Sequence, residues 1–124
     1  MTTETVITKM DWWEIPVADL EEAKRFYGQV MGWSFTEFGE DYFAATGPDG
    51  RMLGGLFKAS ADDLGNGIRI TFSTDDLEGA LDRVTKAGGS ILHGRSEIGG
   101  GMGWWADFLD PAGRRVGFST TNPA

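Results

Sequence analysis

The sequence predicts an α+β fold in which two βαβββ modules form a single domain over residues 1–124. Three observations lead to this prediction. The composition is that of a globular chain, with 40% hydrophobic and 24% charged residues. Two segments carry helix-capping and helix-spacing patterns, and short strand-like segments bounded by glycine and proline surround both of them. The whole pattern occurs twice in the same order, which is typical of an internal repeat.

The first module covers residues from about 5 to 57 and begins with a strand at 6–15, rich in β-branched and aromatic residues. A helix starts at the N-cap Asp19, where Glu22 completes a variant of the capping box, and it ends at Gly32. Its apolar face is formed by Leu20, Ala23, Phe26, Tyr27, Val30 and Met31. Three further strands complete the module, at residues 33–38, 41–46 and 51–57.

A polar linker at 58–66 leads to the second module, which covers residues from about 67 to 120. Its first strand alternates apolar and polar residues over 68–73, and Asp76 is the next helix N-cap. The apolar face of this helix consists of Leu77, Ala80, Leu81 and Val84. The remaining strands are predicted at 89–93, 104–109 and 114–119, and a glycine-rich loop runs from Gly94 to Gly103.

The charge and residue counts exclude several functional classes. A net charge of −8 and a pI near 4.5 argue against nucleic acid and against an anionic membrane as partners. The chain has no cysteine, which excludes disulfides, thiolate catalysis and cysteine-ligated metals. No apolar run reaches the length of a membrane span, and the N-terminus lacks a signal-peptide pattern, so we expect a cytoplasmic protein.

Two stretches carry a family resemblance over nearly the whole chain. The first runs from Glu14-Ile15-Pro16-Val17-Ala18-Asp19 through Phe26-Tyr27 to Met31-Gly32-Trp33, and the second is Asp110-Pro111-Ala112-Gly113. Together with the repeat they resemble the vicinal oxygen chelate superfamily, which includes glyoxalase I, extradiol dioxygenases and the fosfomycin- and bleomycin-resistance proteins. The resemblance implies that each half curls its sheet into half a barrel and that a ligand sits in the concavity.

Metal-dependent members of that family carry four ligand positions, and the resemblance places them here at Trp12, Gly54, Arg69 and Gly117. Tryptophan, glycine and a cationic arginine offer no lone pair to a divalent ion. We therefore expect no metal and no cofactor.

Alternation of side chains along the strands then predicts which residues face the concavity, if Trp12 takes a ligand position. The predicted ligand-binding residues are Trp12, Glu14, Phe43, Arg69, Thr71, Trp104, Phe108 and Arg115. They would form an aromatic cup with few polar groups, widened at its floor by Gly54 and Gly117, unless the aromatic side chains fill the barrel as core. Such a lining suits a planar apolar ligand.

Three features have more than one interpretation. Glu14 beside Arg69 is interpreted first as a structural ion pair, with ligand binding and a role as general base as alternatives. His93, the one histidine, is expected at a strand end, as a surface residue in preference to a catalytic one. The loop at 99–103 is not a dinucleotide fingerprint and is interpreted as a mobile rim.

The function predicted from these observations is metal-independent binding and sequestration of a small molecule, similar to the bleomycin-resistance type. One alternative is an enzyme, either a glyoxalase-like lyase or dioxygenase or a metal-free catalyst using Glu14. Another is a protein-association module with a filled barrel. A homodimer is expected, because the family commonly pairs and open strand edges need covering.

Overall fold

The computed structural model describes residues 7–65 and 67–124, which divide into two compact units. Unit 2 is Trp12–Arg69, and unit 1 combines the chain up to Asp11 with Ile70–Ala124. The division falls within the first strand and not in the predicted linker. Residues 5 and 6 of the first predicted module, the N-terminus judged for a signal peptide, and Asn66 of the linker lie outside the described residues.

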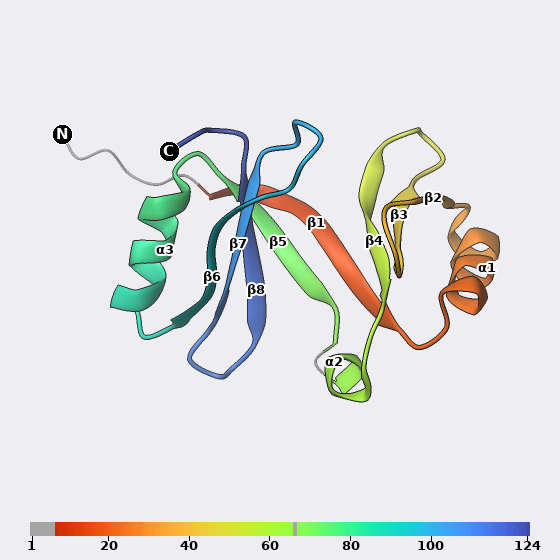
Figure 1. The fold of residues 1–124 in the computed structure, drawn as a ribbon, viewed down its shortest axis with the longest axis horizontal. Helices are drawn as coiled ribbons and strands as arrows, with labels where there is room; N and C mark the ends of the chain where they lie inside the picture. Colours follow the sequence, from red (N-terminus) through yellow and green to blue (C-terminus); the bar gives the residue numbers. More distant parts are fainter. Residues whose placement is uncertain (1–6, 66) are drawn as a thin grey trace. The chain divides into compact units, whose positions relative to one another are not determined.

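Unit 2 contains most of the first βαβββ module. Its elements are the second part of β1 (Ile7–Val17), α1 (Leu20–Met31), β2 (Ser34–Glu37), β3 (Tyr42–Thr46), β4 (Met52–Lys58) and the short α2 (Ala61–Gly65) (Figure 1). The strands lie in the order β2-β3-β4-β1, with β1 parallel to β4 and the other pairs antiparallel. The predicted linker thus contains a helical turn, α2.

Unit 1 repeats the same order of elements. It contains β5 (Arg69–Thr74) apart from its first residue, α3 (Leu77–Lys86), β6 (Ser90–Glu97), β7 (Trp104–Leu109) and β8 (Arg115–Thr120). The strand order is β1-β5-β8-β7-β6, with β5 parallel to β8. Two βαβββ modules are therefore present, which confirms the predicted α+β fold. Strand β6 extends four residues into the segment that was predicted to be the glycine-rich loop.

The helix boundaries follow from the capping residues. The Asp19 carboxylate accepts a hydrogen bond from the Glu22 amide at 3.1 Å, and Gly32 ends α1 with a φ of 72°, which favours glycine. The Asp76 carboxylate caps α3 in the same way, accepting from the Gly79 amide at 3.0 Å. Both N-caps were predicted from the sequence, and both are confirmed.

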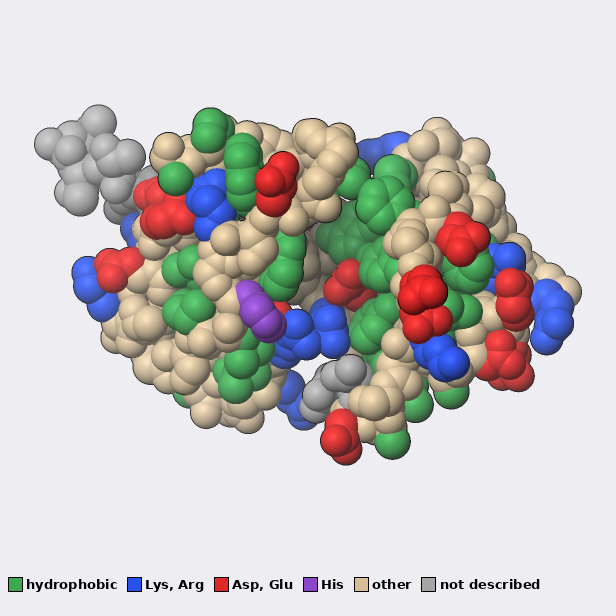
Figure 2. Space-filling view, in the orientation of Figure 1, with side chains coloured by type: hydrophobic (Ala, Val, Ile, Leu, Met, Phe, Trp, Pro, Cys, Tyr) green, Lys and Arg blue, Asp and Glu red, His purple; other side chains and the backbone are tan. Residues whose placement is uncertain are grey.

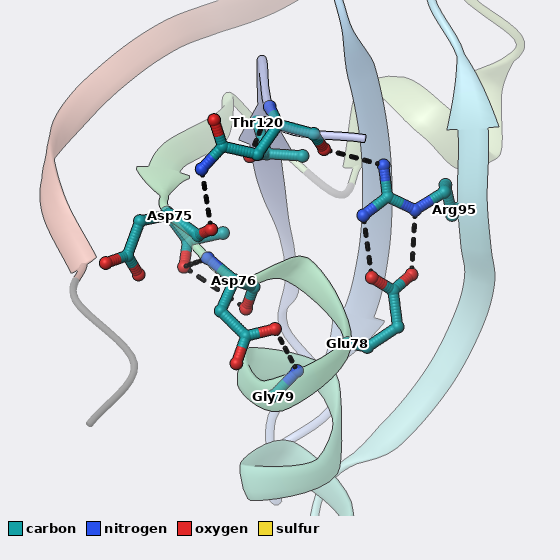
Figure 3. A network of polar contacts seen from close by, with 8 residues as sticks. Asp75, Asp76, Glu78, Gly79, Arg95 and Thr120 are labelled. Carbon is teal, nitrogen blue, oxygen red and sulfur yellow. Dashed lines mark hydrogen bonds and ion pairs between the residues drawn. The ribbon is translucent and has the colours of Figure 1, made fainter. Parts of the chain in front are cut away.

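The start of α3 is tied to the rest of unit 1 by a polar network (Figure 3). Arg95 of β6 donates two hydrogen bonds to the Glu78 carboxylate, at 2.8 and 2.6 Å, and a third to the Asn122 carbonyl. The Asn122 side chain donates in turn to the Asp75 carbonyl at 2.8 Å. The Arg95 guanidinium lowers the pKa of Glu78, chiefly through these hydrogen bonds.

The two helices contribute unequally to the hydrophobic cores. In unit 1, Leu77 and Ala80 of α3 are buried against Ala106 and Phe118 of the sheet. In unit 2, no residue of α1 is fully buried, and about half of the predicted apolar face is exposed. The exposed members of that face are Phe26, Val30 and Met31.

Candidate functional site

In unit 2, one face of the sheet packs against α1 through stacked aromatic side chains. Trp13 of β1 stacks on Trp33 with ring centroids 4.8 Å apart, and Trp33 stacks on Tyr27 of α1 at 5.4 Å. Because side chains alternate along a strand, Trp12 and Glu14 lie on the opposite face. This second face carries the candidate site.

The candidate site is a cluster of five side chains from four strands, which we call the aromatic cluster. Its members are Trp12, Glu14, Tyr42, Phe57 and Arg69. All five are partly buried, so they belong neither to the fully packed core nor to the freely solvated surface.

A chain of hydrogen bonds orders the cluster. The Trp12 indole N–H donates to the Tyr42 hydroxyl at 2.8 Å, and that hydroxyl donates to Glu14 Oε2 at 2.7 Å. The Arg69 guanidinium Nη1 lies 3.8 Å from Glu14 Oε1, which makes an ion pair. Both oxygens of the carboxylate are therefore engaged within the cluster.

The position of Tyr42 depends on a glycine in the neighbouring strand. A Cβ atom built on Gly55 would overlap the Tyr42 phenol ring, so only glycine lets this ring lie flat across β4. Burial raises the pKa of Tyr42, and the adjacent Glu14 carboxylate raises it further. The phenol is therefore held as a neutral hydrogen-bond donor.

Arg69 also contacts an aromatic ring. Its guanidinium carbon lies 4.4 Å from the centroid of the Phe57 ring. A cation over a ring face is stabilised by the negative centre of the π system. Phe57 and Glu14 thus hold the arginine from two sides.

The predicted inward orientation of Phe43 is wrong. The ammonium of Lys24, a residue of α1, lies 4.6 Å from the Phe43 ring centroid, which places this ring on the α1 face. Gly54 also belongs to that face, because a Cβ there would overlap Trp13. On β3 and β4 the prediction started the in–out alternation of side chains one residue out of step. An error of one residue assigns every side chain of a strand to the wrong face.

The same error affects β7 in unit 1. Trp104 and Phe108, which were predicted to line the cup, pack against the hydrophobic core beneath α3. Trp104 is also covered by Arg95, whose guanidinium carbon lies 5.1 Å from the ring centroid. The intervening residues of β7, Trp105 and Asp107, therefore lie on the face opposite α3.

Thr71 and Arg115 lie on the predicted face. A Cβ on Gly117 would come within 2.8 Å of the Thr71 hydroxyl, so these two positions share a side, and Arg115 follows from alternation along β8. Arg115 donates two hydrogen bonds to Asp107, from Nε at 2.7 Å and from Nη2 at 2.6 Å. Asp107 also lies 2.7 Å from the Nδ1 atom of His93.

Four residues of these two faces were not predicted from the sequence. Tyr42 and Phe57 in unit 2, and Trp105 and Asp107 in unit 1, are absent from the predicted lining. A signal was present for Asp107, because an acidic residue in the middle of an otherwise apolar strand needs a partner when it is buried.

Two clefts lie elsewhere. One, of about 450 Å³, lies at the start of α1 and has several acidic residues in its lining, among them Asp19, Glu21 and Asp41. The other, of about 270 Å³, is largely apolar and lies beside the end of α3, against Phe108 and Pro111. Tyr42 is the one member of the aromatic cluster that lines either of these two clefts.

Several solved structures share the fold. The Mn(II)-bound glyoxalase from Novosphingobium aromaticivorans matches 95% of the chain with a TM-score of 0.75 at 18% identity, and the chain spans 40% of that protein's length. Methylmalonyl-CoA epimerase from Mycobacterium tuberculosis matches 99% of the chain and 94% of its own, with a TM-score of 0.71 at 18% identity. Homoprotocatechuate 2,3-dioxygenase from Brevibacterium fuscum matches 92% of the chain and 32% of its own, with a TM-score of 0.72 at 17% identity. At these identities the likeness shows the fold alone.

The manganese bound by the first of these proteins raises the question whether this chain can hold a divalent ion. In the aromatic cluster, Glu14 is the one carboxylate, and the groups around it are hydrogen-bond donors and a cation. In unit 1 the Asp107 carboxylate is already engaged by Arg115 and His93. Across residues 7–65 and 67–124, no three His, Cys, Asp or Glu side chains are grouped as metal ligands. The residues present do not fit such a site.

Sequence comparison identifies the family. No curated protein matches the chain in sequence. Within the described part of the chain, no helix has the length and apolar character needed to cross a membrane. A family model matches residues 9–118, which is most of the chain, and its fold agrees with the repeated βαβββ modules and the structural matches. The chain therefore belongs to the Glyoxalase/Bleomycin resistance protein/Dioxygenase superfamily.

Proposed function

We propose that this protein is a metal-independent small-molecule-binding protein, and that it sequesters a planar, largely apolar ligand on the aromatic cluster of unit 2. One observation supports this most strongly. Three aromatic rings lie on one sheet face around a Glu14–Arg69 ion pair, and the Trp12 N–H and the Tyr42 hydroxyl both form hydrogen bonds within the cluster. Such a surface would therefore contact a ligand mainly through the faces of its aromatic rings.

The half-buried rings of Trp12, Tyr42 and Phe57 suit a flat molecule, because aromatic faces stack on one another. The Arg69 guanidinium beside Phe57 favours a ligand with an acidic or oxygen-rich edge. Binding by contact with rings needs neither a metal ion nor a free carboxylate.

Catalysis by Glu14 is a weaker alternative in this geometry. A general base must reach the proton that it removes, at hydrogen-bond distance from a free lone pair. Glu14 Oε2 accepts from the Tyr42 hydroxyl, and Oε1 faces Arg69. The arrangement favours the structural ion pair, which was the first interpretation of these two residues.

We also propose that the protein is a homodimer. Phe26, Val30 and Met31 of α1 are each about half exposed or more. Covering this face with a second copy would remove apolar surface from water.

The binding proposal can be tested with anilinonaphthalene sulfonate, an aromatic anion with a flat naphthalene ring, whose fluorescence rises on binding. We expect Phe57→Leu to weaken binding roughly tenfold, which corresponds to about 1.4 kcal/mol. The matched control is Phe43→Leu, the same change on the next strand but on the α1 face. Equal affinity of both variants and the wild type would overturn the proposal.

A further inference from the structure

The chain's single histidine belongs to a polar group that the proposed binding function does not use. His93 of β6, Asp107 of β7 and Arg115 of β8 meet on the face of unit 1 opposite α3. His93 is the ladder partner of Asp107, and the ladder register shifts on both sides of it. Such bulges redirect a side chain locally, and here the imidazole is brought against the carboxylate.

The hydrogen bonds fix which imidazole nitrogen carries the proton. His93 Nδ1 lies 2.7 Å from Asp107 Oδ1, and an ionised carboxylate can only accept a hydrogen bond. Nδ1 therefore carries the hydrogen in the neutral ring, and Nε2 carries the lone pair. Arg115 donates to the other carboxylate oxygen from two of its nitrogens, which prevents the carboxylate from turning away.

The burial of the group is graded from inside to outside. The Asp107 side chain is 7% exposed and the Arg115 side chain 27%, whereas the His93 side chain is 56% exposed. The purple side chain of Figure 2, the one histidine, accordingly lies at the surface. A buried carboxylate that orients a largely exposed imidazole is an arrangement that supports general-base catalysis.

One aromatic ring lies beside the imidazole. The ring of Trp105 lies with its centroid 5.3 Å from that of His93, at an angle of 54°. Trp105 shares the face of Asp107, two residues along β7. A flat ring that stacks on the indole would bring its substituents near the imidazole, which favours an aromatic molecule over an aliphatic one.

We propose that His93 is a general base for an aromatic molecule with an acidic hydroxyl group, a phenol, and that Asp107 and Arg115 are its positioning residues. In the proposed step the phenol O–H bond breaks and its electron pair stays on the oxygen. The proton forms a new bond to Nε2, which leaves a phenolate beside an imidazolium. The Asp107 carboxylate compensates the imidazolium charge, and no further reactant is required.

The tautomer can be measured directly, because one histidine gives one pair of ring signals. In protein labelled with nitrogen-15 histidine, at a pH where the ring is neutral, we expect Nδ1 to be protonated and Nε2 to be bare. Asp107→Asn should move the proton to Nε2, since an amide can donate to Nδ1. Glu97→Gln is the control, because it removes an exposed carboxylate from the same strand. A wild-type ring protonated at Nε2 would overturn the proposal, whether or not the variant folds.

Proton transfer itself can be followed with 4-nitrophenol, whose ionised form is yellow. We expect wild-type protein to increase the ionised fraction at a pH below the phenol's own pKa, with the imidazole signals shifting to the protonated form. His93→Gln should lose this effect, and Glu97→Gln, which changes an exposed carboxylate on the same strand, should retain it. Equal ionisation with wild type and His93→Gln would overturn the proposal, as would an unchanged imidazole signal.

Discussion

The hydroxyl of Tyr42 holds the aromatic cluster together, so removing this one atom tests the cluster as a unit. Tyr42→Phe leaves the ring over Gly55 but deletes the bridge between Trp12 and Glu14. The indole N–H then lacks its acceptor, and the carboxylate lacks one donor. Because both partners are only partly buried, water can replace some of these bonds.

The magnitude follows from the two bonds that are lost. A hydrogen bond to a charged group contributes about 1.5–3 kcal/mol to stability, and one between neutral groups contributes about 1 kcal/mol. The Glu14 side chain is 26% exposed, which lowers the net loss. We expect Tyr42→Phe to reduce the free energy of unfolding by about 2 kcal/mol.

The measurement is urea unfolding followed by tryptophan fluorescence, with the midpoint falling and the slope unchanged. The chain supplies a matched control in its one other tyrosine, Tyr27, which stacks on Trp33 on the opposite face. Tyr27→Phe removes the same atom outside the cluster. If both variants lose the same stability, the hydrogen-bond chain has no special role and the reasoning fails.

Three further predictions follow from other parts of the structure. Since the pKa of Tyr42 is raised in the folded chain, its contribution is complete below the ordinary tyrosine value of about 10 and is lost as the pH rises above it, so the difference in the free energy of unfolding between wild type and Tyr42→Phe, measured by urea unfolding, should shrink above about pH 10. Since the pKa of Glu78 is lowered by Arg95, wild type should be more stable than Glu78→Gln at neutral pH, and this difference should disappear below about pH 4. The difference should be small and should decrease with added salt, which unfolding curves measured across an acid titration would show. Because α1 leaves its apolar face exposed, sedimentation at micromolar concentration should show a species of twice 13.5 kDa, and a purely monomeric boundary would contradict the dimer.

Much of the fold could be predicted because its signals are local. The N-caps Asp19 and Asp76, the C-terminal Gly32 and the hairpin turns act within a few residues, and their recurrence in order identified the repeat. The short helix α2 was missed because five residues carry too weak a periodicity. The exposure of Phe26 and Val30 was also unpredictable, since spacing shows which residues share a face but not what covers that face.

The candidate site was predicted only in part, because the in–out alternation of side chains was started from the correct residue on some strands and from the wrong residue on others. Trp12, Glu14 and Arg69 are brought together as expected, because the alternation was counted from the correct residue on β1 and on β5. Phe43 and Trp104 lie on the opposite faces, because on short hairpin strands the starting residue of the alternation is ambiguous. Phe43 was therefore predicted in the place that Tyr42 occupies, and Trp104 in the place that Trp105 occupies.

His93 is exposed, as predicted, but it lies within β6 and not at a strand end, and its pairing with Asp107 could not be predicted, since the shifts of register that flank it leave no mark in the sequence. A regular ladder extended from the start of β6 would not pair this residue with Asp107, because the register shifts between Ile91 and His93. Only the ladder shows that it pairs with Asp107.

The two units carry chemically similar groups that differ in one respect. Each has an arginine and a ring donor on one carboxylate, with Tyr42 and Arg69 at Glu14 and with His93 and Arg115 at Asp107. The tyrosine hydroxyl has only one proton to donate, and it donates to the carboxylate while accepting from an indole. The imidazole has a second nitrogen, and the His93 side chain is 56% exposed. The first group can therefore offer a ligand only surface and charge, whereas the second can exchange a proton with it.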